Sequence, residues 1–254
     1  MAVELPGWEP FEFGNDHISH RVFMRGAGPA VVLIHELPGL TRQCVALAER
    51  LVAARYCVFM PLLFGRPNED AILRNTMRLC ISREIWVFRS RRTSPIVDWL
   101  RALCRKTKAQ CGGPGVGVIG MCLTGNFAIT LLAEESVIAP VTCQPSLPLG
   151  FSRSARELAM SPEDLDAVKT RARESDTVLL GFRFKDDRLC RPEKFERIKQ
   201  ELGSHFDANT LPGAGHCVLT RDFVDETGHP TKQALEKTLR FLDERLRAQT
   251  SQLP

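Results

Sequence analysis

A cysteine stands in the sequence where the fold would need a nucleophile. Residues 116–120 form an apolar run typical of a buried strand, and residues 120–125 read G-M-C-L-T-G before a helical pattern begins. A nucleophile elbow is a sharp turn between a strand and a helix, and small neighbours let its backbone pass without a clash. Gly120 precedes Cys122 by two residues and Gly125 follows it by three. The pattern therefore predicts Cys122 as a nucleophile, with the start of the helix favouring its thiolate.

The motif departs from the strict G-x-S-x-G pattern at one place. Thr124 occupies the position two residues after the cysteine, and no G-x-S-x-G motif elsewhere in the chain offers a competing serine. Free cysteine is commonly a small buried hydrophobic residue, and only Cys122 lies at a glycine-flanked junction of strand and helix. The remaining eight cysteines are expected to be packing residues: Cys44, Cys57, Cys80, Cys104, Cys111, Cys143, Cys190 and Cys217.

A histidine with the right position for a general base follows the last predicted strand. His216 ends the glycine-rich segment 211–216, L-P-G-A-G-H, and lies downstream of Cys122. A thiol nucleophile needs such a base to remove and return its proton. His205 and His229 lack this position and are expected to be ordinary surface histidines. His216 is therefore the predicted base.

The acid that orients the histidine should follow the preceding strand, between the nucleophile and the histidine in chain order. The predicted strand Thr177–Phe182 leads into R-F-K-D-D-R, so Asp186 and Asp187 are both candidates. Spacing alone does not choose between them.

The first fully apolar run, Ala30–Ile34, ends in H-E-L-P-G. An elbow of this kind takes one oxyanion-binding N–H from the residue after the nucleophile and another from the loop after this strand. The backbones of Leu123 and Leu37 are thus the predicted oxyanion hole. Glu36 is a carboxylate at the same edge, placed to cap the next turn or to pair with the thiol or its proton.

Strand-like and helix-like segments alternate along the chain. The predicted strands are Ile18–Met24, Ala30–Ile34, Tyr56–Met60, Val116–Gly120, Val137–Cys143, Thr177–Phe182 and Phe206–Leu211. Helices are predicted after Thr41, from Ser94 to Gly112, over Leu123–Ala133, after Ser161, and over Pro192–Leu202 and Thr231–Arg247, while residues 144–162 are irregular or a small cap. Such alternation predicts a mostly parallel sheet with helices on both faces, and ligands bind beyond the carboxyl ends of its strands. Every candidate residue above follows a strand.

Composition agrees with one globular α/β domain over residues 1–254. Hydrophobic residues make up 44% and charged residues 25% of the chain, which excludes collagen, coiled coil and global disorder. The net charge of +4 is too small to indicate nucleic-acid binding by itself. The N-terminus lacks an export signal, and no apolar run reaches the ~20 residues of a membrane span. With nine cysteines and no CxxC pair, the sequence predicts reduced thiols in the cytoplasm.

Taken together, these segments resemble the dienelactone hydrolase family of α/β-hydrolases, in which a cysteine replaces the usual serine. Residues 31–40, 118–125 and 212–216 and the turn at Asp187 carry the resemblance, in the family's order and over most of the chain. The resemblance implies that Cys122 attacks an ester or lactone carbonyl, His216 moves the proton and Asp187 holds the imidazole. It also implies that Glu36 pairs with the resting cysteine and helps to deprotonate it.

The sequence departs from the family in the residues that anchor the substrate. Well-known members carry an arginine four residues after the histidine, which grips a substrate carboxylate. Here that position is Thr220 and the arginine comes one later, at Arg221. A second family arginine corresponds to Arg83, with a weak local match.

The sequence thus predicts a carboxylic ester or lactone hydrolase that needs no metal or organic cofactor and acts on a small molecule through a thioester. One alternative is a non-catalytic, redox-responsive or ligand-binding protein of the same fold. Another is nucleic-acid binding by a basic stretch, for which a solvated helix face is the simpler explanation because no aromatic residues are interleaved. That stretch comprises Arg83, Arg89, Arg91, Arg92, Arg101, Arg105, Lys106 and Lys108. Neither membrane binding nor nucleic-acid binding is expected, and the sequence does not distinguish a monomer from a homodimer.

Overall fold

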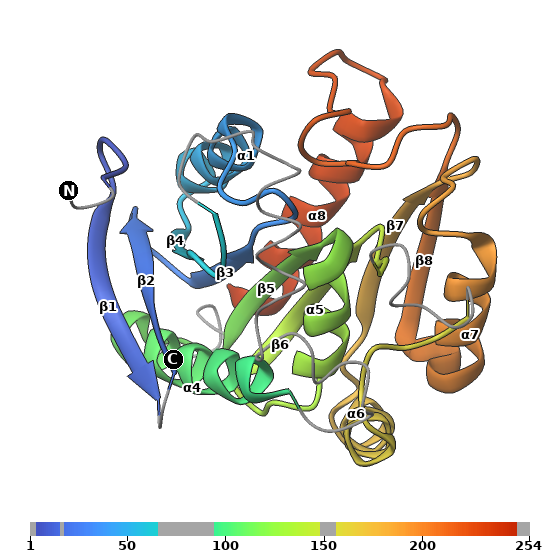
Figure 1. Cartoon of the computed structure of the whole chain (residues 1–254), viewed down its shortest axis with the longest axis horizontal. Helices are drawn as coiled ribbons and strands as arrows, with labels where there is room; N and C mark the ends of the chain where they lie inside the picture. The colour runs from blue at the N-terminus through green and yellow to red at the C-terminus, as the bar shows by residue number, and fades with distance from the viewer. Residues whose placement is uncertain (1–3, 16–17, 66–93, 148–155, 248–254) are drawn as a thin grey trace, which may run out of the picture.

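The computed structural model describes residues 4–15, 18–65, 94–147 and 156–247 (Figure 1). Its strands form one sheet of eight in the order β1-β2-β4-β3-β5-β6-β7-β8. The strands are β1 (Glu9–Asn15), β2 (Ile18–Arg25), β3 (Ala30–Ile34), β4 (Cys57–Pro61), β5 (Val116–Met121), β6 (Val137–Cys143), β7 (Leu179–Phe184) and β8 (Phe206–Leu211). Strands β3 to β8 are parallel, and β1 and β2 join them in antiparallel pairing. The predicted α/β fold with a mostly parallel sheet is confirmed.

Helices cover both faces of this sheet, as Figure 1 shows. On one face α1 (Arg42–Ala53) and α8 (Pro230–Leu246) pack in a single apolar cluster with β5 and β6. On the other face lie α4 (Pro95–Cys111), α5 (Gly125–Leu131), α6 (Pro162–Ser175) and α7 (Pro192–Leu202). The central strands β3 and β5 are buried along their whole length, which explains why their residues are almost all apolar.

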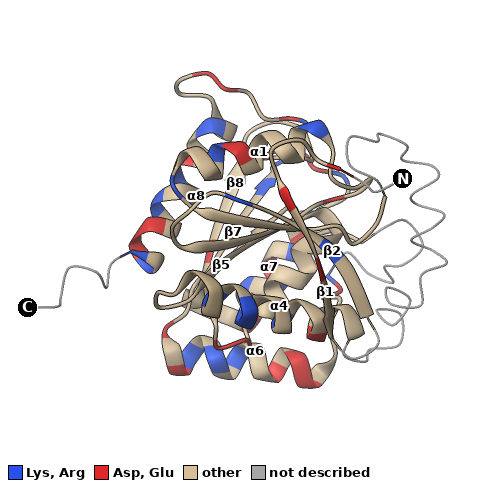
Figure 2. Ribbon diagram, turned by 90° about the vertical axis from the view of Figure 1, so that its left-hand side faces the viewer, with Lys and Arg blue, Asp and Glu red and all other residues tan. Residues whose placement is uncertain are grey.

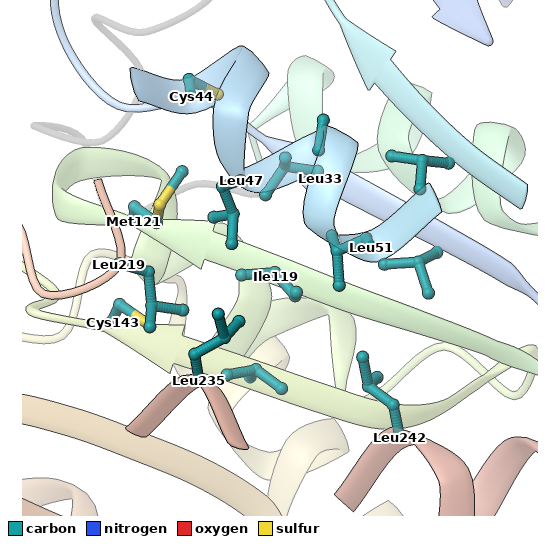
Figure 3. Close-up of a cluster of buried hydrophobic side chains, with 14 of the residues drawn as sticks. Leu33, Cys44, Leu47, Leu51, Ile119, Met121, Cys143, Leu219, Leu235 and Leu242 are labelled. Carbon is teal, nitrogen blue, oxygen red and sulfur yellow. The ribbon is translucent and has the colours of Figure 1, made fainter. Parts of the chain in front are cut away.

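Figure 3 shows the core between α1, β5, β6 and α8, in which two of the nine cysteines take part. Cys44 and Cys143 are fully buried among leucines and Ile119. Met121 and Leu219 lie at the end of this core that is nearest to the loops carrying the candidate site residues. The core therefore fixes the end of β5, from which the elbow starts.

Several predicted boundaries are wrong by a few residues. The strand predicted over Thr177–Phe182 runs from Leu179 to Phe184, because α6 ends at Ser175 and is followed by the capping residue Asp176, which has a left-handed φ of 50°. The helix predicted over Leu123–Ala133 is a short 3-10 turn, Cys122–Thr124, followed by α5. Strand β1 was not predicted, although Phe11 and Phe13 alternate along it and pack against the core.

Residues 148–155, part of the segment predicted to be irregular or a small cap, lie outside the described residues. Within the described ranges, no helix combines the length and hydrophobicity needed to cross a membrane.

Candidate active site

The predicted nucleophile lies on a strained turn directly after β5. Cys122 has a φ of 55°, a left-handed conformation that costs a residue with a side chain about 1–2 kcal/mol. A non-glycine residue held in this region is frequently found at functional sites, because the surrounding structure must impose it. The side chain of Cys122 is half-buried beside the start of the 3-10 turn.

The neighbours of Cys122 explain how the turn is imposed. A Cβ on Gly120 would lie 2.3 Å from the carbonyl oxygen of Thr124, so only glycine lets the chain fold back at this point. The Thr124 hydroxyl accepts from the amide of Met121 at 2.9 Å and lies 2.9 Å from the carbonyl oxygen of Ile34, to which it can donate. The departure from the G-x-S-x-G pattern is therefore a threonine that joins the elbow to the end of β3.

Gly120→Ala is expected to destabilise the protein by about 3 kcal/mol, because the new methyl group has no space without moving the backbone of the elbow. Urea unfolding followed by circular dichroism measures the change. Gly14→Ala on strand β1 is the matched control, since the atoms nearest to its new Cβ would lie 3.7 Å away, in ordinary van der Waals contact. Equal costs for the two substitutions would contradict this account of the turn.

His216 and Asp187 meet as the sequence predicts, and the geometry chooses between the two aspartates. Nδ1 of His216 lies 2.8 Å from Oδ2 of Asp187, whose side chain is 1% exposed. Oδ1 of Asp187 accepts from the amides of Leu189 at 2.8 Å and Cys190 at 3.0 Å. Asp186 is exposed, and its own amide donates to Gly213. In the turn after β7, Asp187 is therefore buried and Asp186 faces solvent.

The imidazole of His216 lies between this carboxylate and Cys122. Burial of the ring disfavours its charged form, but the hydrogen bond with Asp187 and the interaction with Cys122 outweigh that cost and raise the pKa of His216 to about 10. An imidazolium beside a cysteine favours the thiolate. The arrangement can therefore hold a thiolate–imidazolium pair, in which the histidine already carries the proton that a leaving group needs.

This pKa shift predicts how stability changes with pH. Between the ordinary histidine value of 6.5 and about 10, the folded protein binds a proton at His216 that the unfolded chain has lost. The stabilisation is therefore complete below pH 6.5 and is lost as the pH rises toward 10. The difference in unfolding free energy between wild type and His216→Ala, measured in urea, is expected to shrink from pH 6.5 to pH 10. A constant difference over this range would contradict the raised pKa.

A second aspartate, which the sequence did not identify, holds the histidine loop in place. Oδ2 of Asp222 accepts from the amide of His216 at 2.7 Å and from that of Cys217 at 2.8 Å. A Cβ on Gly215 would lie 2.7 Å from the Phe184 ring and 2.9 Å from Asp222, so the loop passes this carboxylate tightly. Asp222 thus fixes the backbone from which His216 projects.

Glu36 is buried at the end of β3, but its hydrogen bonds lead away from the thiol. It accepts from the hydroxyl of Thr220 and, at 3.2 Å, from Nε2 of Gln144, and it is hydrogen-bonded to Cys217. Burial raises the pKa of Glu36, while these hydrogen bonds and the charge of His216 oppose the rise. Within the described part of the chain, no hydrogen bond joins Glu36 directly to Cys122.

Cys217, which the sequence assigned to packing, contacts this network. It is half-buried next to His216, and burial together with the charge of Glu36 raises the pKa of its thiol. Five of the other cysteines are buried as expected, namely Cys44, Cys57, Cys104, Cys143 and Cys190, whereas Cys111 is half-buried and Cys80 lies outside the described residues. Cys217 was expected to be a packing residue, but its thiol contacts the candidate site through Glu36.

The two predicted oxyanion-hole residues flank the cysteine. Leu123 and Leu37 form an apolar cluster with Cys122, Phe64 and Leu147. The amide of Leu123 lies in the first turn after β5, where helical N–H groups have no partner within the helix. The Leu123 amide is thus a candidate donor in the turn that carries the sulfur, and apolar side chains lie around the sulfur.

The predicted substrate-binding arginines are not at the centre of the described site. Arg221 is exposed, and Arg83 lies outside the described residues. Thr220, at the position of the family's arginine, is buried, and its hydroxyl is engaged by Glu36. The cationic anchor that the resemblance implies is therefore replaced, at this position, by a neutral hydroxyl.

Two more residues at the site come from the turn after β6, which the sequence analysis placed in an irregular segment. Gln144 has a φ of 38° and directs its amide to Glu36. Ser146 places its hydroxyl 3.2 Å from the sulfur of Cys122. The positions of both directly after a strand could have identified them, since each candidate residue was found by the same rule.

The basic stretch weighed for nucleic-acid binding is partly neutralised where the structure describes it. Arg101 pairs with Asp98 and Asp164 at 2.8 Å, and Arg105 pairs with Glu134 at 2.6 Å. In the ribbon of Figure 2, segments of basic and of acidic residues both occur along the outer helix α6. Arg83, Arg89, Arg91 and Arg92 lie outside the described residues.

Comparison with known proteins identifies the family. The model of the dienelactone hydrolase family matches residues 22–246. No match was found among curated proteins.

Several solved structures share the fold at low sequence identity. A candidate dienelactone hydrolase from Klebsiella pneumoniae is 16% identical with a TM-score of 0.67, over 93% of this chain and 98% of that one. A dienelactone hydrolase-like promiscuous phosphotriesterase from metagenomic libraries is 15% identical with a TM-score of 0.64, over 94% and 98%. The thioesterase domain from the curacin biosynthetic pathway is 11% identical with a TM-score of 0.59, over 91% and 99%. The family match covers nearly the whole described fold, so the chain belongs to the dienelactone hydrolase family and is an α/β-hydrolase.

Proposed function

We propose that the protein hydrolyses small carboxylic esters or lactones through a thioester on Cys122. The observation that carries this proposal is the juxtaposition of a cysteine at a strained elbow with an imidazole whose other nitrogen is 2.8 Å from a buried aspartate. Nucleophilic catalysis needs a nucleophile, a base beside it and a group that orients the base, and these three residues fill those roles.

The proposed reaction has two halves. The Cys122 thiolate attacks the acyl carbon, and the negative charge on the carbonyl oxygen is stabilised by the amides of Leu37 and Leu123. His216 gives its proton to the departing alkoxide or enolate. A water molecule then loses a proton to the neutral imidazole and attacks the thioester, and the thiolate leaves with the electron pair of the C–S bond. Loss of one oxyanion donor typically costs about 3 kcal/mol in the barrier.

The surroundings of Cys122 favour a neutral, largely apolar acyl group. Leu37, Phe64, Leu123 and Leu147 cluster around the cysteine, and such side chains bind an apolar group by excluding water from it. Thr220 supplies no positive charge for a substrate carboxylate. We therefore expect neutral aryl esters and neutral lactones to be hydrolysed at least as fast as lactones that bear a carboxylate.

A panel of p-nitrophenyl esters, neutral lactones and carboxylate-bearing lactones tests this proposal through kcat/KM for each. Hydrolysis of neutral members by wild type supports it. A strong preference for carboxylate-bearing lactones would contradict the proposed acyl preference. Folded wild-type protein that hydrolyses no member would contradict ester hydrolysis, and peroxide-dependent changes in such a protein would favour the redox-responsive alternative.

A further inference from the structure

Ser146 lies at the sulfur of the proposed nucleophile, although no motif drew attention to it. Its hydroxyl oxygen is 3.2 Å from Sγ of Cys122, and the residue is 2% exposed. Within the described residues, this is the contact that the hydroxyl makes. A polar group buried this deeply needs a hydrogen-bond partner, and here the partner is the sulfur.

The backbone around Ser146 holds the hydroxyl in this place. The amide of Ser146 donates to the carbonyl oxygen of Cys122 at 3.1 Å. Nδ2 of Asn126 lies 3.0 Å from the carbonyl oxygens of both Ser146 and Leu123, so one side-chain amide connects the turn after β6 to the elbow. Because these bonds involve only the backbone of Ser146, removing its hydroxyl leaves the turn connected.

The direction of the hydrogen bond follows from the state of the sulfur. A thiolate carries no proton, so when Cys122 is ionised the hydroxyl must be the donor. Hydrogen bonds to a charged acceptor are about twice as strong as neutral ones, which gives the ionised form the larger benefit. A thiolate here therefore has its hydrogen-bond donor in Ser146 and a nearby positive charge in His216, whose Nε2 has no hydrogen-bond partner within the described residues.

We propose that Ser146 is a catalytic residue whose hydroxyl donates a hydrogen bond to the Cys122 thiolate. This inference rests on the proposed function and deepens it. When Cys122 is ionised, the bond stabilises the charge on the sulfur and holds the sulfur in place before a substrate arrives. In the second half of the reaction, the same hydroxyl stabilises the sulfur as it leaves with the electron pair of the C–S bond.

Alkylation of Cys122 by iodoacetamide measures the fraction of ionised thiol without any turnover of substrate. Its rate can be followed by peptide mass spectrometry from pH 4 to 10. In Ser146→Ala the pH midpoint of alkylation is expected to rise by about one unit, so that alkylation below the midpoint slows about tenfold. The acid limb of kcat/KM for a neutral ester should move up by the same amount, while activity at high pH changes less. A merely structural role would lower activity at every pH.

Two further variants control the test. Ser146→Thr keeps the hydroxyl and is expected to keep the wild-type midpoint. Ser136→Ala removes another buried hydroxyl, which bonds Glu134 in the turn before β6, and should leave both the alkylation and the activity unchanged.

An unchanged alkylation midpoint in folded Ser146→Ala would overturn the inference. A lowered midpoint would overturn it as well, since the hydroxyl would then stabilise the thiol as an acceptor. Failure of the proposed function looks different, because the wild type would then hydrolyse no ester, or Cys122→Ala would keep the esterase activity, whatever the alkylation shows.

Discussion

Cys122→Ala is expected to lose at least about a thousandfold in kcat/KM toward neutral aryl esters, with the fold retained. Removing one member of a nucleophile–base–acid set abolishes the covalent route and leaves only the residual catalysis of the oxyanion hole. Methyl replaces a half-buried thiol, so the core contacts of Met121 and Leu123 remain. Initial rates with p-nitrophenyl esters measure the loss, and circular dichroism checks the fold.

Cys122→Gly separates the catalytic role of this residue from its conformational cost. It should be as inactive as Cys122→Ala, but more stable than it by about 1 kcal/mol, because glycine adopts a φ of 55° without the steric cost of a Cβ. Urea unfolding of the two variants measures the difference. Activity in either variant would contradict the nucleophile assignment, and a less stable glycine variant would contradict the strain at the elbow.

Asp187→Asn is expected to lower kcat by about 10³- to 10⁴-fold, whereas Asp186→Asn should remain within a few-fold of wild type. Oδ1 of Asp187 accepts from two amides, so an asparagine must place its oxygen there. Its NH₂ group would then face Nδ1 of His216 and donate to it. The imidazole would carry its proton on the nitrogen that faces Cys122, which prevents that nitrogen from accepting one.

The pH dependence of kcat/KM for the two variants checks this explanation as well as the magnitude. Asp186 is the matched control because it is the neighbouring residue and is exposed, and within the described residues its backbone amide alone bonds to the turn. Equal, mild effects of the two substitutions would reject the role of Asp187 in orienting the histidine.

The fold and the centre of the candidate site could be predicted because they depend on local patterns. The apolar runs of β3 and β5 predicted central strands, and residues that follow parallel strands gather at one edge of a sheet. Cys122, His216 and Glu36 all follow such strands, and the glycines around Cys122 and before His216 singled out those two residues. The same rule could not separate Asp186 from Asp187, because the predicted strand before them was placed two residues too early and both positions remained equivalent.

Other residues could not be predicted because their contacts depend on how the loops fold. Thr124 appeared to be a departure from a motif, and only its bond to the end of β3 explains it. Asp222 acts through the backbone of its own loop, and Cys217 approaches Glu36 from a distant part of the chain. Their residue types are common in turns, so their identity carried no signal before the loops were placed.

The most direct test of the central claim is to trap the acyl-enzyme. Wild-type protein mixed with excess p-nitrophenyl butyrate and quenched in acid within the first turnovers preserves a thioester, which peptide mass spectrometry can locate. We predict a butyryl group on the peptide containing Cys122, removable with hydroxylamine and absent from Cys122→Ala. Steady hydrolysis with the acyl group on another residue, or with none on Cys122, would contradict the account.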